Sequence, residues 1–373
     1  MPRFSGGVTV RSQTVCRCVT ETGYGFGMTK TILISAALAA ICVAGCKKKD
    51  GESSGGGMVT LNASGSSFQK QFQEVAVEGF AKIAKDVKIN YGAGGSGKGR
   101  QDFADQVTDY GCTDGLFKEA ELAKVKGGPF LYFPILLGAI TVSYHVDGVA
   151  KLQLSPETIA KIFQRDIKKW NDPAIAADNP DATLPDADIV VAHRSDGSGT
   201  TEQFTKYLEV AAKDVWRLKS GSTVEWSADT QAGAGNGGVA QLIKSTKNSI
   251  GYVDLPDAKA AGLTYASVKN QAGKFIEPSS ASASAAGDGI DVKDDLTYAS
   301  VNAKGDAAYP ITAPTWCVAY TKQSDKAKGT ALKSYFKYML TDAQALIKDI
   351  DFAPLPKSLA NKAVVQLDKI QVP

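Results

Sequence analysis

The sequence predicts an α/β protein in which strands and helices alternate around a doubly wound sheet. Segments typical of strands alternate along the chain with segments whose apolar residues recur at helical spacing. Gly- and Ser-rich turns follow several of the strands, where open α/β sheets place their ligand-binding loops. The 373 residues, 43 % apolar and 22 % charged, fit a globular protein of about two domains.

The strands are predicted from β-branched and apolar runs bounded by polar or Gly residues. They cover residues 59–61, 87–91, 131–146 (as two consecutive strands), 189–192, 249–253 and 315–320.

The helices are predicted from spacing and from their start signals. Ser155 and Pro156 are typical of a cap and first turn, and Ser198 to Glu202 open another helix. The Ser/Ala-rich stretch 279–287 is predicted as a mobile surface loop. The predicted helices cover residues 68–83, a short helix around 103, 155–163, 198–216, 331–340 and 342–348.

The N-terminus carries a targeting signal rather than part of the fold. Lys30 precedes an apolar and small-residue stretch at 32–44, and Gly45 stands before Cys46. This order is typical of a secretory signal, and the stretch is shorter than the ~18 apolar residues of a membrane span. The Cys after small residues resembles the lipobox of bacterial lipoproteins, which implies cleavage before Cys46 and its lipidation.

The signal sets the N-terminal boundaries. We assign 1–45 to an N-terminal extension with the signal proper at 28–45, and 46–58 to a flexible tether. Because Met28 begins a complete signal by itself, we hypothesise that translation starts there.

Charge and cysteine counts exclude several classes of protein. Residues 1–45 hold four of the 42 basic and one of the 39 acidic residues, so 46–373 carries 38 of each. That balance excludes a general nucleic-acid binder, and any bound anion needs a local site. With two His in the chain and no Cys-x-x-Cys, we expect no metal site and no cofactor. Cys112 and Cys317 form either a disulfide or two buried thiols.

Four loops have the residues to hold a small oxyanion, although each alone also fits an ordinary turn or cap. They span residues 65–68, 92–99, 109–114 and 194–200. The first and fourth begin helices, whose free N–H groups attract anions. In the fourth, Arg194 can grip an oxyanion with two parallel hydrogen bonds, and Asp196 can hold the Arg in place.

Two enzymatic interpretations of these loops are excluded because a required residue of each motif is missing. Gly97 and Lys98 suit a nucleotide P-loop, but Gly99 stands where a Ser or Thr would hold Mg²⁺. A nucleophile elbow at Ser198 would need Gly two residues earlier, where the chain has Asp196.

Together the four loops resemble the bacterial periplasmic phosphate-binding proteins, the substrate-binding components of phosphate ABC transporters. Further support comes from segments 168–175, 235–238, 250–253 and 309–312, so that the resemblance covers about residues 59–360.

The resemblance implies a two-lobed periplasmic-binding-protein fold of class II type with crossover strands at the hinge. Lobe one then covers 59–138 plus 311–373, and lobe two covers 139–310. It also implies a non-enzymatic lipoprotein, anchored on the periplasmic side of the cell envelope, that passes phosphate to permease subunits and their ATPase.

The family pattern assigns a role to each matching residue. The implied donors to the phosphate are the Ser67 hydroxyl, the Phe68 backbone N–H, the Arg194 side chain and the helix start at Ser198, Gly199 and Thr200.

Asp114 and the Gly-rich turn complete the implied site. Asp114 would accept a hydrogen bond from the protonated oxygen of phosphate, which sulfate lacks, so it favours phosphate or arsenate. The turn departs from the family, because Gly95 replaces the usual Ser. The backbone N–H of Gly95 can still donate to the phosphate, while the hydroxyl that the family Ser would supply must come from Ser96 or be lost. Phosphate or arsenate sensing and a phosphoesterase activity remain as alternatives.

Overall fold

A nine-stranded mixed sheet organises residues 57–373, the part of the chain that the computed structural model describes. The signal at 28–45, the start at Met28, Cys46 and nearly all of the tether lie outside the described residues. Within residues 57–373, no helix combines the length and apolar character needed to cross a membrane.

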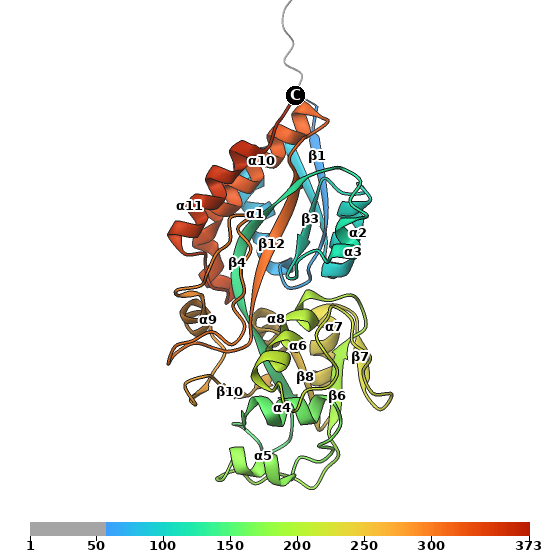
Figure 1. Ribbon diagram of the computed structural model, residues 1–373, viewed down its shortest axis with the longest axis vertical. Helices are drawn as coiled ribbons and strands as arrows, with labels where there is room; N and C mark the ends of the chain where they lie inside the picture. Colours follow the sequence, from blue (N-terminus) through green and yellow to red (C-terminus); the bar gives the residue numbers. More distant parts are fainter. Residues whose placement is uncertain (1–56) are drawn as a thin grey trace, which may run out of the picture. The chain divides into compact units, whose positions relative to one another are not determined.

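The strand order is β2-β1-β3-β12-β4-β8-β6-β7, with β9 added on β4, and a separate small sheet has the order β11-β10-β5. We call the part around β1–β3 the first lobe and the part around β6–β8 the second lobe (Figure 1). The strands are β1 (Val59–Gly65), β2 (Val87–Gly92), β3 (Tyr110–Thr113), β4 (Phe130–His145), β5 (Gln153–Leu154), β6 (Val190–Arg194), β7 (Gln231–Gly233), β8 (Ser249–Asp254), β9 (Thr264–Tyr265), β10 (Ser267–Lys269), β11 (Phe275–Ile276) and β12 (Thr312–Tyr320).

The long strand β4 connects the two lobes. It pairs antiparallel with β12 up to Ala139 and with β8 from Ile140 onward. The prediction of two consecutive strands at 131–146 was therefore wrong. The strand changes its neighbours without changing direction, and it needs no polar turn there because both of its faces are buried.

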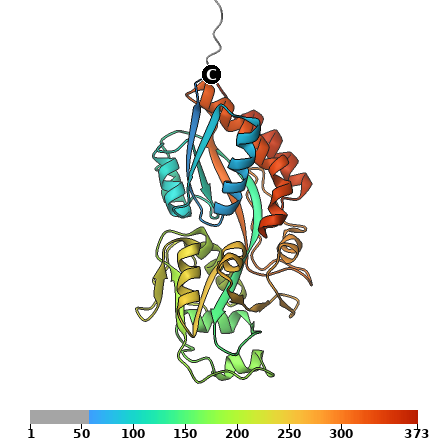
Figure 2. The same ribbon diagram turned by 180° about the vertical axis from the view of Figure 1, so that it is seen from behind.

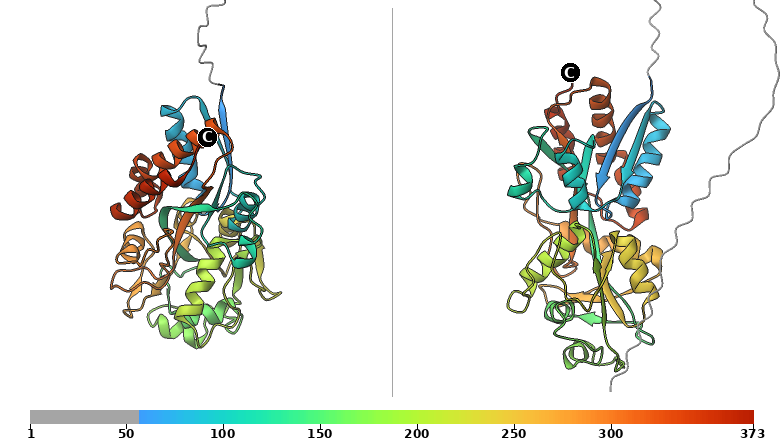
Figure 3. Two further views of the ribbon diagram at one scale, coloured as in Figure 1. Left: turned by 45° about the horizontal axis from the view of Figure 1, so that its top comes forward. Right: turned by 90° about the vertical axis from the view of Figure 1, so that its right-hand side faces the viewer.

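Helices cover both faces of the sheet in each lobe. In the first lobe, α1 (Lys70–Ile83), α10 (Lys326–Leu340) and α11 (Lys357–Gln366) lie on one side, and α2 (Ser96–Ala104) and α3 (Glu119–Leu122) on the other (Figure 2). In the second lobe, α4 (Pro156–Phe163) and α6 (Gly199–Ala211) lie opposite α7 (Gly235–Ser245) and α8 (Leu255–Ala261) (Figure 3).

Alternation along the strands separates the packing on the two faces of the second lobe. On β6, Val191 belongs to the large core that contains Phe204 of α6. Its neighbour Ala192 packs instead in a smaller cluster with Val239 and Ile243 of α7. Successive strand residues point to opposite faces, so one strand supplies both cores.

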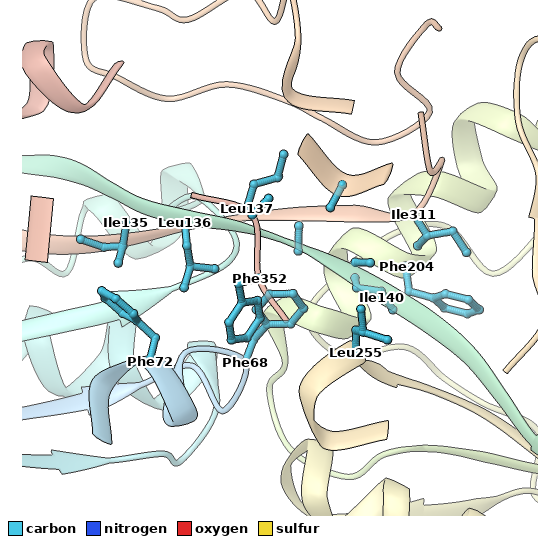
Figure 4. Packing of buried hydrophobic residues seen from close by; sticks show 14 of the residues in the cluster. Phe68, Phe72, Ile135, Leu136, Leu137, Ile140, Phe204, Leu255, Ile311 and Phe352 are labelled. Atoms are coloured by element: carbon cyan, nitrogen blue, oxygen red, sulfur yellow. The ribbon is translucent and has the colours of Figure 1, made fainter. Parts of the chain in front are cut away.

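The large core continues from one lobe into the other along β4. Figure 4 shows Leu136 of β4 among the aromatic residues of the first lobe and Ile140, farther along the same strand, on the side of Phe204. The ring of Phe68, 1 % exposed, lies 5.4 Å from that of Phe352, measured between centroids. This packing fixes the loop before α1, which is one of the four candidate loops.

The stretch 279–287 is a helix, α9 (Ser280–Gly287), and the prediction of a mobile loop was wrong. Ser279 caps it by accepting from the N–H of Ser282 at 3.0 Å. Ala283 and Ala286 are buried, and the small side chains bring the helix close to β4. Alanine has the highest helix propensity, so the Ser/Ala composition suits a capped helix as well as a loop.

The remaining helices differ from the predictions mainly at their ends. α6 stops at Ala211 rather than near residue 216, and 342–350 winds as a 3₁₀ helix. The predicted cap of α4 is confirmed, since Ser155 accepts from the N–H of Thr158. The other short helices are α5 (Pro173–Asp178), η1 (Asp342–Ile350) and η2 (Leu367–Lys369).

Candidate functional site

Asp114 is a buried carboxylate at the end of β3, with 1 % of its surface exposed. Its Oδ2 accepts hydrogen bonds from the hydroxyls of Ser66 at 2.6 Å and Ser96 at 3.1 Å. Its Oδ1 is buried and accepts no hydrogen bond from residues 57–373. Burial raises the pKa of Asp114 to about 6, although the two Ser hydrogen bonds act in the opposite direction.

Arg194 ends β6 and is held by two partners. Its Nε donates to Asp196 Oδ1 at 2.9 Å and its Nη2 to Asp196 Oδ2 at 2.5 Å. Its Nη1 donates to Asn236 Oδ1 at 2.7 Å. Burial alone would raise the pKa of Asp196, but the hydrogen bonds and charge of Arg194 hold it below its ordinary value. The guanidinium is thus fixed in one orientation at the end of the strand.

The N-terminus of α6 faces the buried carboxylate. Ser198 caps the helix, with its Oγ accepting from the N–H of Thr201 at 3.0 Å. A Cβ on Gly199 would lie 2.5 Å from Ser96 Oγ and 2.6 Å from Asp114 Cβ. Only glycine therefore lets this helix start approach Asp114 so closely. The N–H groups at such a helix start carry partial positive charge and suit an anion.

Loops of the two lobes make direct contact at this place. The Gly97 N–H donates to the Gly197 carbonyl at 2.8 Å, and the Gln203 side chain to the Asp114 carbonyl at 2.6 Å. The Asn236 N–H donates to Ser67 Oγ at 3.2 Å. The structure thus brings all four candidate loops together.

Two backbone groups predicted to face the ligand have partners within the protein. The Phe68 N–H donates to Ser66 Oγ at 3.0 Å, and the Gly95 N–H donates to the Gly65 carbonyl at 2.8 Å. The hydroxyl of the Gly-rich turn comes from Ser96, which is directed at Asp114.

Ser66 and Asn236 are site residues that sequence reasoning did not single out. Ser66 stands beside Ser67 in the first loop, and only the fold shows which of the two reaches Asp114. Asn236 stands in a run of glycines just after a short strand, a pattern that can signal a functional helix start.

His193 has a separate environment from the anion loops. Its Nε2 lies 2.9 Å from Thr230 Oγ1, and its ring stacks on Trp226 with centroids 5.1 Å apart. Burial lowers its pKa. Within residues 57–373, no group of three or more His, Cys, Asp and Glu side chains is arranged to hold a metal ion.

Comparisons with known proteins identify the family of this chain. The model of the PBP superfamily domain matches residues 50–343. The phosphate-binding protein PstS of Xylella fastidiosa is 32 % identical over 343 residues, covering 87 % of this chain and 93 % of the relative. The phosphate-binding protein PstS of Pasteurella multocida is 36 % identical over 286 residues, covering 75 % and 81 %.

Solved structures show the same fold. A phosphate-binding protein from Stenotrophomonas maltophilia superimposes with a TM-score of 0.67 at 18 % identity, covering 82 % of this chain and 93 % of that one. The periplasmic phosphate-binding protein PfluDING, solved with phosphate, gives 0.68 at 22 % identity, covering 83 % and 93 %. With the sequence relatives, these results show that the chain belongs to the PBP superfamily and, within it, to the family of periplasmic phosphate-binding proteins.

Proposed function

We propose that this protein binds inorganic phosphate between its two lobes and delivers it to the permease subunits of an ABC transporter and their ATPase. The relatives that share a third of its sequence are named phosphate-binding proteins. The observation that carries the proposal is Asp114 Oδ1, a buried acceptor without a partner among residues 57–373, beside an array of donors.

An acceptor among donors distinguishes phosphate from sulfate. Near neutral pH, phosphate keeps at least one proton, which it can donate to Asp114, whereas sulfate has none. A buried polar group left unpaired costs about 1–3 kcal/mol, and more when it is charged. Because 1.4 kcal/mol corresponds to about tenfold in affinity, one such group already gives strong selection against sulfate. Arsenate carries the same proton and is expected to bind.

The proposed site combines groups from both lobes. Two N–H groups of Arg194 have no partner among residues 57–373, and they would form a fork toward two phosphate oxygens. Asp196 and Asn236 accept from the other three N–H groups, and these hydrogen bonds support the proposed orientation of the fork. The further donors in this proposal are Ser67, Ser198, Gly199 and Thr200. The Phe68 N–H and the Ser96 hydroxyl are bonded to Ser66 and Asp114, so together with Gly95 they shape the loops around the site.

The proposed lobes are 59–138 plus 311–373 and 139–310. The exchange of partners on β4 at Ala139 and Ile140 supports this division. Contacts between the loops of the two lobes support a ligand that bridges both lobes. Such a ligand favours the closed form, because only the closed form makes every contact between the ligand and the two lobes.

We further propose a carrier rather than an enzyme, exported and anchored through a lipid on Cys46. A hydrolase would need a base beside its nucleophile. Ser198, the candidate nucleophile, caps a helix, and His193, the candidate base, bonds to Thr230 instead of Ser198. Both contacts support a carrier.

Calorimetric titration tests the proposed function. The purified protein, stripped of bound phosphate, is titrated with phosphate and with sulfate in parallel. We expect tight 1:1 phosphate binding, no sulfate heat and a large loss of affinity and selectivity in Asp114→Asn. Asp102→Asn is the matched control, because Asp102 also accepts from a Ser hydroxyl, at 2.6 Å, but lies outside the site. A folded wild-type protein that binds no phosphate would overturn the proposal.

A further inference from the structure

Asn236 is a fully buried amide in the first turn of α7 that connects three of the proposed ligand residues. Its Oδ1 accepts from Arg194, and its Nδ2 donates to Thr200 Oγ1 at 3.2 Å. The same Nδ2 also donates to Asp254 Oδ2. Its backbone N–H donates across the lobes to Ser67 Oγ at 3.2 Å.

The partners of Asn236 leave only one orientation for its amide. A guanidinium can only donate, so the amide atom facing Arg194 must be the oxygen. The nitrogen then faces Thr200 and Asp254, and its two hydrogens match these two acceptors. Asp254, 2 % exposed, is itself held by the Asp257 N–H at 2.8 Å. Every hydrogen-bonding group of the amide is therefore used, and the side chain cannot flip without losing partners.

This orientation determines what each neighbour can offer to an anion. Arg194 has five N–H groups, and Asp196 and Asn236 use three of them, one on each nitrogen. Within the described part of the chain, one N–H remains on Nη1 and one on Nη2, and these two form the fork that fits two oxygens of an anion.

The two hydroxyls are directed in the same way. Thr200 Oγ1 and Ser67 Oγ each accept a hydrogen bond from Asn236. A hydroxyl has one hydrogen, and one that already accepts is free to donate that hydrogen elsewhere. Both hydroxyls can therefore act as donors to an anion.

We propose that Asn236 is a positioning residue that directs the hydrogens of Arg194, Thr200 and Ser67 toward the bound anion. This inference rests on the proposed function, because it concerns the same site. The two hydroxyls differ in a way that can be tested. The orientation of the Thr200 hydroxyl depends on the Asn236 side chain, whereas that of the Ser67 hydroxyl depends only on the backbone N–H of Asn236.

Asn236→Asp is the decisive variant, because it keeps the size and the acceptor facing Arg194. A carboxylate has no hydrogen for Thr200 or for Asp254. The Thr200 hydroxyl would therefore donate to it and be lost to the ligand, while the contact with the Asp254 carboxylate adds a cost that does not depend on Thr200. We expect phosphate affinity to fall about 10- to 100-fold, which is the range for the loss of one hydrogen bond to a charged group. Thr200→Val should cost a similar factor, and Thr200→Ser should bind as the wild type does.

The cycle of double variants separates positioning from general disruption. In the Thr200→Val background, Asn236→Asp should cost at least about fivefold less than in the wild type, because the hydroxyl it misdirects is already gone. In the Ser67→Ala background, its cost should match that in the wild type within about twofold. Phosphate affinity is measured by titration, and thermal unfolding of each phosphate-free variant checks that it folds.

Asn236→Ala repeats the cycle without a new charge, in case Asn236→Asp does not fold. It should again couple to Thr200→Val and not to Ser67→Ala. Equal costs in all backgrounds would overturn the positioning role and leave the phosphate site intact. If the wild-type protein itself does not bind phosphate, the proposed function fails first, and the positioning role fails with it.

Discussion

Arg100 Nη1 lies 3.8 Å from the Glu202 carboxylate, so a largely buried ion pair joins α2 of the first lobe to α6 of the second. Arg100 is 2 % exposed and also donates to Glu121 and Thr113, each at 3.0 Å. Burial raises the pKa of Glu202, while the charge of Arg100 acts against this rise. The pair lies outside the proposed set of ligand residues and links the two lobes.

Glu202→Gln should weaken phosphate binding without touching the ligand. Removing one partner of a buried pair destabilises the arrangement that contains it. We expect an affinity loss of about 3- to 10-fold, or roughly 1 kcal/mol, mainly through faster dissociation because the closed form opens more often. Stopped-flow release of phosphate measures this rate. Glu209→Gln is the control on the same helix, since Glu209 pairs with Lys206 at the surface. Equal rates for the two variants would contradict the prediction.

The raised pKa of Asp114 predicts a pH effect on the stability of the phosphate-free protein. Its folded pKa is about 6, above the ordinary value near 4 for an Asp. The folded state therefore holds this proton more tightly than the unfolded state does. Its contribution to the free energy of unfolding is present below pH ~4 and is lost as the pH rises through ~6, at a cost of up to about 3 kcal/mol.

Asp114→Asn should remove this pH dependence. Between pH 4 and 7.5 the wild type should lose up to about 3 kcal/mol more stability than the variant, measured by urea unfolding without phosphate. Other carboxyl groups titrate equally in both proteins and cancel in the difference. Parallel pH profiles for wild type and variant would refute a raised pKa at Asp114.

Gly95→Ser should harm the site. Gly95 has a φ of +91°, and an added Cβ would collide with Asp196 Oδ2 and lie 2.8 Å from the Gly197 carbonyl. The strained backbone and the displaced Asp196 together should cost about 1–3 kcal/mol and at least tenfold in phosphate affinity. Gly94→Ser is the control, because its Cβ would meet only the flexible Lys98 side chain. Tighter binding by Gly95→Ser would show that the turn adapts.

The Cys112 and Cys317 sulfurs lie 3.2 Å apart on paired strands as two free, buried thiols. Burial raises the pKa of Cys112, which keeps it as an unreactive thiol. We expect neither residue to react with an alkylating reagent in the native protein, and both to react after unfolding without reductant. Peptide mapping of the two labelled sites measures this. Full protection of both after unfolding would instead reveal a disulfide.

Much of the fold could be predicted from the order of the amino acids, because strand and helix patterns and caps are local. The start of α4 at Ser155 and Pro156 and the strand before Arg194 were predictable in this way. The four candidate loops could be recognised from the sequence because Gly, Ser, Arg and Asp residues at the ends of strands usually form turns or contact ligands.

Only the tertiary structure decided the partners of these residues. Local pattern could not show that β4 passes between the lobes as one strand, because its neighbours β8 and β12 come much later in the chain. Nor could it show that Ser66 reaches Asp114 or that Asn236 holds Arg194. Hydrogen bonds between residues distant in sequence depend on how the strands and helices of each lobe assemble, and that assembly has no short-range signature in the chain.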